Sequence, residues 1–508
     1  MTLLLTLLYF FAGTLCANHD AGPNNQMNDG LQQVRRQSEG LVDLTQVVGH
    51  KLAIVGDYLH IHGGWAEYAD PGTGNVTYGG SGPPQPRTLS IYLGEPWDSE
   101  HVEINIIDSS DLPHFLNQEV WMDPSGDSFW AWGGQYQDGP HNLNPWRFTP
   151  DGDGGGSWEE VPMEGADGYD ALLKPIQGAV TVTGRDTAYI LGGQARQEPL
   201  EEYHSEFLKG LVSYDMDANS WANTSAGCCI ESLVQDDHIQ GFFTPSFGAN
   251  GLLVYVGFWW TPESQVDMGT VKFYDPETDT WNSQATSGET PFHRVGYCAI
   301  GVESPDGTYE IYMYGGMPIF YWEFDEWPEE LWILTLPGFH WMKADIAMTG
   351  SFRFKQQCIR AGGRQMLSVG GELRLEGPDL MPLSYILDGG VYRHHLPVLD
   401  MTNLSWSNEF DPDMDEYDSP QMVKDWYSEG NLDDVPWFNE EVKSLFIRSA
   451  STQPPSTRAT ATDISPTGFA ISTGVTALPN TSDDGAGLPQ VTAGAVAGGA
   501  ALAILLGL

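Results

Sequence analysis

The sequence predicts an all-β protein built from repeated units whose strands are joined by turns. Its 508 residues include 59 glycines and 33 prolines, and 12% of the residues are aromatic. Glycine and proline are frequent in turns, and aromatic side chains are frequent in strands. A chain of this length can bury one large core or several, so disorder over the whole length is excluded.

The charge of the chain restricts its partners. Aspartate and glutamate number 69 against 22 lysines and arginines, which gives a formal net charge of -47 at pH 7. Nucleic acids and anionic lipid headgroups attract basic surfaces and repel acidic ones. We therefore expect no nucleic-acid partner and no function that depends on reading phosphate groups.

Short strand-like runs that end in Gly-Gly recur along the chain, and one of the six has lost a glycine. Neighbouring runs are roughly 55 to 70 residues apart. A period in this range, with several strands in each unit, predicts the blades of a β-propeller. The runs are Tyr58–Gly64, Phe129–Gly134, Ala188–Gly193, Leu252–Gly257, Tyr312–Gly316 and Met366–Gly371.

A tryptophan that closes a hairpin is the second repeated marker. We expect its indole to pack between neighbouring sheets. The two markers occur in one order and predict six blades between residues 41 and 410, with a seventh as an open alternative. Blade 1 lacks the tryptophan and is expected to use Thr88–Leu93 and Val102–Ile107 as its outer strands. The tryptophans are Trp158, Trp221, Trp281, Trp341 and Trp406.

At these residues the sequence resembles the kelch repeat, whose blades carry Gly-Gly after the second strand and a tryptophan in the fourth. Leu334–Trp341, Gly362–Gly371 and Val435–Phe446 are closer still to fungal secreted or surface-anchored kelch proteins. The resemblance implies a kelch-type β-propeller, in the superfamily of the galactose oxidase central domain, displayed outside the cell. It implies no particular activity, because most such proteins have none assigned.

The N-terminal end has the features of a secreted protein. An apolar run from Leu3 to Phe11, followed by small residues, is typical of a signal peptide. A stretch between the propeller and the last residues is rich in Ser, Thr and Pro, as in an O-glycosylated stalk. The expected segments are 1–17 signal peptide, 18–40 lead-in, 41–410 propeller, 411–448 extension packed on the propeller, 449–490 stalk and 491–508 apolar tail.

The apolar tail at residues 491–508 has two interpretations. Small residues and a polar spacer precede it, which is the order of a glycosylphosphatidylinositol (GPI) signal with attachment at Asn480 or Ser482. A C-terminal transmembrane anchor is the alternative, although the tail is short for a span. Either one predicts a membrane-anchored glycoprotein at the cell surface. Sequons for N-glycosylation agree with this location, at Asn75, Asn223 and Asn403.

Two cysteines occupy equivalent places in neighbouring blades. Cys298 and Cys358 each lie in the strand that precedes a Gly-Gly strand, so we predict a disulfide between them. Such a bridge closes a loop of about 60 residues and contributes on the order of 4 kcal/mol in the chain-entropy model. The pairing of Cys228 and Cys229 stays open.

The loops that follow the Gly-Gly turns should emerge on one face of the propeller. They carry aromatic side chains and carboxylates, which can stack on sugar rings or anchor a protein interface. We predict that this face binds a glycan or a protein; the alternative is that the aromatic side chains only cap neighbouring blades. The predicted contact residues are Trp65, Tyr136, Trp259, Trp260, Tyr321, Trp322 and Trp327.

Motifs for catalysis and metal binding are weak. His60 and His62 share one face of a strand, as metal ligands can, but no third ligand is identifiable and packing is the preferred interpretation. The acidic run at residues 411–416 departs from an EF-hand loop at Glu416 and Met422, so we expect a solvated loop. We predict no metal, no cofactor and no catalytic residue in a monomeric binding module.

An oxidase is the main alternative from a different functional class. Copper radical enzymes similar to galactose oxidase also use a kelch propeller, with two tyrosines and two histidines around copper and a cysteine crosslinked to one tyrosine. One ligand in that family comes from a further C-terminal β-domain, whereas the region after Phe446 resembles a stalk. A structural wall protein without a specific ligand is the third possibility.

Overall fold

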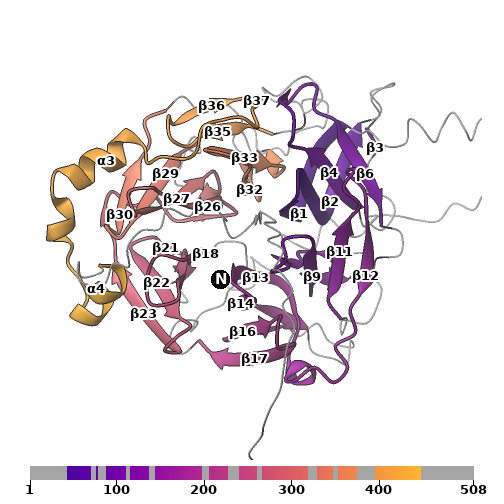
Figure 1. Cartoon of the computed structure of the whole chain (residues 1–508), viewed down its shortest axis with the longest axis horizontal. Coiled ribbons are helices and arrows are strands. Elements are labelled where there is room, and N and C mark those ends of the chain that lie inside the picture. The colour runs from indigo at the N-terminus through magenta and orange to yellow at the C-terminus, as the bar shows by residue number, and fades with distance from the viewer. Residues whose placement is uncertain are drawn as a thin grey trace, which may run out of the picture. The chain divides into compact units, whose positions relative to one another are not determined.

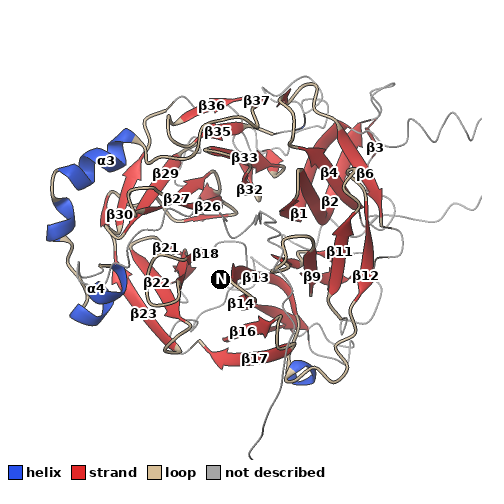
Figure 2. Ribbon diagram, viewed as in Figure 1, coloured by secondary structure: helices blue, strands red, loops and turns tan. Residues whose placement is uncertain are grey.

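The structure is a computed structural model of the chain. It describes residues 43–69, 76–77, 87–109, 112, 115–136, 144–196, 205–226, 239–259, 266–318, 329–346, 353–373, 394 and 396–447. The chain divides into two units, Met1–Ile471 and Ser472–Leu508, and every described residue lies in the first. In that unit six antiparallel sheets are arranged around an axis (Figure 1), so the predicted six-bladed β-propeller is confirmed. Figure 2 shows strands throughout the ring and helices mainly at its rim.

Each blade is an antiparallel meander of four strands that runs from the axis to the rim. Blade 1 contains β1 (Asp43–Val55), β2 (Tyr58–Ala69), β4 (Arg87–Tyr92) and β6 (Ile104–Asp108), and blade 2 contains β8 (Glu119–Met122), β9 (Phe129–Trp132), β11 (Trp146–Pro150) and β12 (Gly156–Glu160). Blade 3 contains β13 (Pro175–Gly184), β14 (Thr187–Arg196), β16 (Gly210–Asp215) and β17 (Ser220–Ser225), and blade 4 contains β18 (Gln240–Thr244), β19 (Leu252–Val256), β22 (Thr270–Asp275) and β23 (Thr280–Ala285). Blade 5 contains β26 (Cys298–Glu303), β27 (Tyr309–Tyr314), β29 (Leu331–Leu336) and β30 (His340–Lys343), and blade 6 contains β32 (Gln357–Arg360), β33 (Gln365–Val369), β35 (Val398–Asp400) and β36 (Ser405–Ser407).

The inner strands of successive blades contact one another around the whole ring, including β1 with β32. Blade 5 has a fifth strand, β24 (Ser287–Gly288), which runs parallel to β30. The outer strands expected for blade 1 are present as β4 and β6. The ring is therefore closed, and each blade has a neighbour on both faces.

Pairs of short strands lie at the Gly-Gly turns, and we call this set of strands the collar; one strand of each pair follows the turn directly. Gly315 and Gly316 have φ angles of 69° and 81°, in the left-handed region that side chains other than glycine rarely adopt. A Cβ atom added at Gly316 would lie 2.7 Å from the Cβ of Tyr297, so the turn has no room for one. The collar contains β7 (Phe115–Leu116) with β10 (Gln135–Tyr136), β20 (Phe258–Trp259) with β21 (Val266–Asp267), β25 (Arg294–Val295) with β28 (Met317–Pro318), β31 (Arg353–Phe354) with β34 (Glu372–Leu373), and the far ends of β2 and β14 with β3 (Val76–Thr77) and β15 (Ser205–Phe207).

Two buried arginines of the collar donate hydrogen bonds to carbonyl groups of the Gly-Gly turns. Arg294 donates a hydrogen bond to the Gly315 carbonyl at 2.9 Å, and Arg353 donates one to the Gly371 carbonyl at 2.9 Å. Arg294 also pairs with Glu330, with 2.5 Å between Nη2 and Oε2. Desolvation by burial lowers the pKa of Arg294 to about 10, which still leaves the guanidinium charged at neutral pH.

In blades 2 to 6 the tryptophan at the end of the blade packs against the preceding blade. The Trp158 indole in blade 2 donates to the Thr88 hydroxyl of blade 1 at 3.0 Å. The Trp341 indole in blade 5 donates to the Met268 carbonyl, in the part of the chain that leads into blade 4's third strand, at 2.7 Å. Large apolar area is removed from water at each of these contacts. The other tryptophans that pack in this way are Trp221, Trp281 and Trp406.

A different aromatic pair closes the ring at blade 1, which lacks this tryptophan. In the connection between β4 and β6, β5 (Trp97–Asp98) pairs with β37 (Glu409–Phe410), which follows blade 6. The rings of Trp97 and Phe410 stack with their centroids 5.1 Å apart. The Ser99 amide also donates to the Asn408 carbonyl at 2.8 Å. Side-chain packing and a two-residue strand pair therefore join the first blade to the last.

The chain after β37 packs along the outer edge of blades 5 and 4. It contains α3 (Gln421–Ser428), η5 (Asn431–Asp434) and α4 (Glu440–Phe446), drawn at the rim in Figure 1. The Phe446 ring lies 4.9 Å from Phe247 and 4.8 Å from Phe339, measured between centroids. Upstream, the Tyr417 hydroxyl donates to the buried carboxylate of Glu310 at 2.9 Å. Among the described helices, none is long and apolar enough to cross a bilayer.

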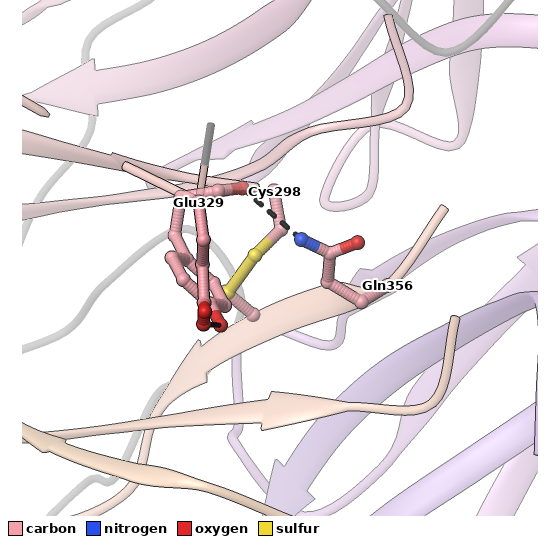
Figure 3. The surroundings of a disulfide bond; sticks show 5 residues. Cys298, Glu329 and Gln356 are labelled. Atoms are coloured by element: carbon pink, nitrogen blue, oxygen red, sulfur yellow. Dashed lines mark hydrogen bonds between the residues drawn. A yellow bond between two sulfur atoms is a disulfide. The ribbon is translucent and has the colours of Figure 1, made fainter. Parts of the chain in front are cut away.

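The inner strands of neighbouring blades meet near the axis, where contacts at two junctions join a residue of one blade to the next blade's strand in the same offset. In every blade one inner-strand residue pairs with the residue just before the glycine turn, and we call these six residues the axial layer. Cys298 of this layer is bonded to Cys358, which follows the layer residue of blade 6, so the predicted disulfide is confirmed (Figure 3). At the same place between blades 2 and 3, the Thr181 hydroxyl donates to Glu119 at 2.7 Å. The axial layer consists of Lys51, Glu119, Val180, Gln240, Cys298 and Gln357.

The stacked pair at the ring closure should contribute measurably to stability. We expect Trp97→Ala to lower the free energy of unfolding by about 2 kcal/mol, less than the value for a fully buried aromatic because Trp97 is half-buried. Chemical denaturation of the full chain measures the change. Phe438→Ala is the control, since its side chain is 73% exposed and its loss should cost almost nothing. Equal effects of the two changes would contradict the assigned role of Trp97.

The equivalence of the junctions predicts a second disulfide. Gln240 and Ala299 occupy, between blades 4 and 5, the places that Cys298 and Cys358 occupy between blades 5 and 6. We expect the Gln240→Cys, Ala299→Cys double variant to form the bond spontaneously, as shown by non-reducing peptide mapping. Gln240→Cys with Ile300→Cys is the control, because adjacent strand residues point to opposite faces. Crosslinking of the control pair to the same extent would contradict the register.

Candidate functional site

The structure places the predicted contact residues of the binding face on the collar where it describes them. Trp65, Tyr136 and Trp259 lie in β2, β10 and β20, so they are strand residues and not the loop residues that we expected. Trp65 is half-buried and pairs with Val48 of β1. The other predicted contact residues, Trp260, Tyr321, Trp322 and Trp327, lie outside the described residues.

Two of the predicted glycosylation sites lie on the surface. Asn223 is exposed on β17, and Asn403 is exposed in the turn between β35 and β36. The Asn403 amide donates to Asp400 at 3.0 Å. Asn75, Asn480 and Ser482 lie outside the described residues.

A cavity lies at the propeller axis and is lined by the inner strand of every blade. Its volume is about 70 Å³, which is room for a few water molecules or one edge of a larger ligand. Its polar lining consists of Lys51, Glu119, Thr181, Gln240 and Gln357, and its apolar lining includes Val120, Val180, Ala299 and the disulfide.

One ion pair dominates the charge of this cavity. The Lys51 Nζ is 3.4 Å from the Glu119 Oε1, and the Thr181 hydroxyl donates to the other carboxylate oxygen. The Glu119 side chain is only 2% exposed, whereas that of Lys51 is 25% exposed. A buried carboxylate needs such partners to offset its lost hydration. The pair makes the cavity neutral overall and leaves part of the ammonium open to it.

Two carboxamides in the lining are available to a ligand. Within the part of the chain that the structure describes, no hydrogen bond joins the side chain of Gln240 or Gln357 to the protein. Each carboxamide offers both donor and acceptor atoms. The two come from blades 4 and 6, on different sides of the axis.

The cavity lies beside the collar. Its axial-layer residues pair with the last residue before each glycine turn, and one strand of each collar pair continues the chain directly after that turn. Lys51 pairs with His62, and Gly63 follows His62 in β2. Trp65 lies two residues further along β2, so it belongs to the same end of the propeller. An approaching ligand can therefore contact the collar and the cavity together.

His60 and His62 pack between blades 1 and 2. The His62 Nδ1 is 3.1 Å from the Thr88 hydroxyl, and its Nε2 is 2.8 Å from the Gln118 Oε1. The His60 ring packs 5.0 Å from Phe148, and neither of its nitrogens has a hydrogen-bond partner among the described residues. Burial lowers the pKa of each histidine to about 4, so both are neutral at physiological pH.

The acidic run after blade 6 forms salt bridges with arginines. Arg364 lies 3.5 Å from Asp415 and 3.0 Å from Asp400, and Arg360 lies 3.4 Å from Glu416. Asp415 and Glu416 are 87% and 85% exposed, as expected of a solvated loop.

Three side chains at an exposed turn have the spacing of possible metal ligands, namely Asp98, Glu100 and His101. His101 Nδ1 is 2.8 Å from Asp98, and this hydrogen bond lowers the pKa of the Asp98 carboxyl. The same carboxylate accepts the Glu100 amide at 2.9 Å. These contacts stabilise the turn next to the ring-closing strand β5.

These structural features define a six-bladed β-propeller, a fold that supports an interaction module in general. No known family model matches the chain. Over 430 residues the chain is 22% identical to a protein of Arthroderma benhamiae described as a kelch repeat-containing protein. The match covers 76% of this chain and 60% of the relative, so the chain spans less than two thirds of the relative's length. The kelch resemblance predicted from the sequence is confirmed by this similarity and by the fold.

Sequence reasoning missed the axial cavity. Its lining residues lie in the strand before each Gly-Gly strand, and this placement is the only signal that could have indicated them. The turn between those strands varies, from Gly56–Asp57 in blade 1 to residues 304–308 in blade 5. A strand residue changes face when the register shifts by one, so counting back from the glycines does not identify the residues that face the axis.

The buried histidines predict acid sensitivity. Burial lowers the pKa of His60 from 6.5 to about 4. His60 therefore binds a proton less tightly in the folded state than in the unfolded state. As the pH falls from 6.5 towards 4, protonation of His60 favours the unfolded state, so the free energy of unfolding decreases. This loss amounts to about 3 kcal/mol. We expect His60→Leu to retain more of its stability between pH 6.5 and 4, measured by chemical denaturation.

His101→Leu is the matched control for this prediction, because the His101 side chain is 77% exposed. We expect its stability to depend on pH almost as that of the unchanged protein does. If His60→Leu and the unchanged protein lose equal stability on acidification, His60 is not the buried neutral group described above.

Proposed function

We propose that this protein is a binding module displayed at the outer cell surface, with a glycan or protein ligand held on the collar side of the propeller. The axial cavity is the observation on which the proposal depends, because it brings together an ammonium group and two carboxamides at the end of the propeller that also carries Trp65. Concave sites with a few convergent polar groups and aromatic side chains are typical of ligand binding. Strand residues deeper in the blades are committed to packing between the blades.

Several features of the sequence support the proposed location. The N-terminal apolar run fits a signal peptide, and the apolar tail fits a GPI signal or a membrane anchor. Exposure of Asn223 and Asn403 makes both sequons accessible to glycosylation. In this proposal the Ser/Thr/Pro-rich stalk holds a monomeric propeller away from the membrane.

The collar aromatics should matter for binding more than for stability. We expect Trp65→Ala to abolish binding on a glycan array or to a panel of extracellular proteins, while the melting temperature falls much less than on loss of a fully buried tryptophan. Trp341→Ala is the contrasting variant, because its indole is 1% exposed and its loss should cost about 3–5 kcal/mol. A large fall in melting temperature for Trp65→Ala would assign this residue to blade packing and remove it from the site.

A further inference from the structure

We infer that the axial cavity is a subsite for a vicinal diol of a carbohydrate, and hence that the ligand of the collar face is a glycan. The inference rests on the proposed function, because it names the ligand class for the same face. It depends on three properties of the cavity: its charge, its hydrogen-bonding groups and its apolar wall.

The charge of the cavity favours a neutral ligand. The Lys51 ammonium lies 3.4 Å from the Glu119 carboxylate, so neither charge is left to attract a free ion strongly. An approaching anion would also meet the repulsion of a chain with a net charge of -47. An approaching cation would meet the Lys51 ammonium, which is already placed at the carboxylate.

The hydrogen-bonding groups suit hydroxyls. Gln240 and Gln357 each offer a donor and an acceptor, and the Lys51 ammonium has donors beyond the one directed at Glu119. A hydroxyl both donates and accepts, so neighbouring hydroxyls can satisfy an ammonium and a carboxamide together. A ligand with only acceptors would leave half of each carboxamide unpaired, at a cost in affinity.

The remaining wall is apolar and suits the C–H groups of a sugar ring. Val120, Val180, Ala299 and the disulfide line the cavity between the polar groups. Only one edge of a sugar has to enter, because the collar lies directly beside the axial layer. The rest of the glycan would then extend across the collar, where an aromatic face such as that of Trp65 can stack on a second ring.

Titration of the full chain with methyl α-D-mannopyranoside, D-glucose and D-galactose, followed by ligand-observed NMR, tests this subsite. We expect saturable binding of at least one sugar. Ala299→Leu adds bulk to the cavity wall, and Gln357→Leu removes a carboxamide, so each should weaken that binding at least tenfold. Gln421→Leu is the matched control, since this exposed residue lies on α3 at the rim, and it should bind as the unchanged chain does.

A third variant, Glu119→Gln, distinguishes a binding role of the cavity from a purely structural role, because it should change which ligand the cavity binds. Its amide oxygen can still accept from Thr181, but the Lys51 ammonium loses its counter-charge. We expect this variant to gain binding of acetate, which the unchanged chain should not bind. The melting temperature of each variant reports whether the fold is intact.

The possible results separate this subsite from the proposed function. If glycans bind the chain on an array but Ala299→Leu and Gln357→Leu bind them equally well, the subsite is wrong and the binding function stands. If the unchanged chain binds acetate in place of the sugars, the cavity is an anion site and the inference is overturned. If no glycan binds and only protein ligands do, the ligand class named here is wrong.

Discussion

Packing of an aromatic side chain from each blade onto the preceding blade is the interaction on which the propeller depends. A four-stranded sheet exposes two apolar faces and can bury both only between two neighbours, so the blades must form a closed ring. The Trp341 indole shows how complete this burial is, with 1% exposure and a hydrogen bond of 2.7 Å to the Met268 carbonyl. Where the first blade lacks the tryptophan, Trp97 stacks on Phe410 and completes the ring.

Closure of the ring brings together at the axis residues that are far apart in the sequence. Because the inner strands contact one another in order, equivalent positions form a repeated junction. One junction holds the Cys298–Cys358 disulfide, and another holds the hydrogen bond from Thr181 to Glu119. The packing that stabilises the propeller therefore also builds the lining of the axial cavity, beside the collar on which a ligand would lie.

Features that depend on local backbone geometry could be predicted from the sequence, whereas features that depend on register could not. Gly315 and Gly316 mark a turn because only glycine readily adopts their positive φ angles. The disulfide followed from the presence of both cysteines in strands that precede such turns, although the register places Cys358 one residue beyond the position equivalent to that of Cys298. The collar strands are only two residues long in most blades, too short for a periodic pattern. Trp97 carries no repeated marker, so its role at the ring closure was visible only in the structure.

Native-state hydrogen exchange tests most directly whether the six blades form one closed ring that unfolds as a single unit. Blade 1 draws its four strands from one continuous part of the chain, so cooperative closure must come from its contacts with blades 2 and 6. The account predicts that amides of β1 and β32 exchange with the same free energy as those of β18 and β26, through global unfolding. Exchange of β1 at a distinctly lower free energy would show that blade 1 opens separately, which would contradict the account.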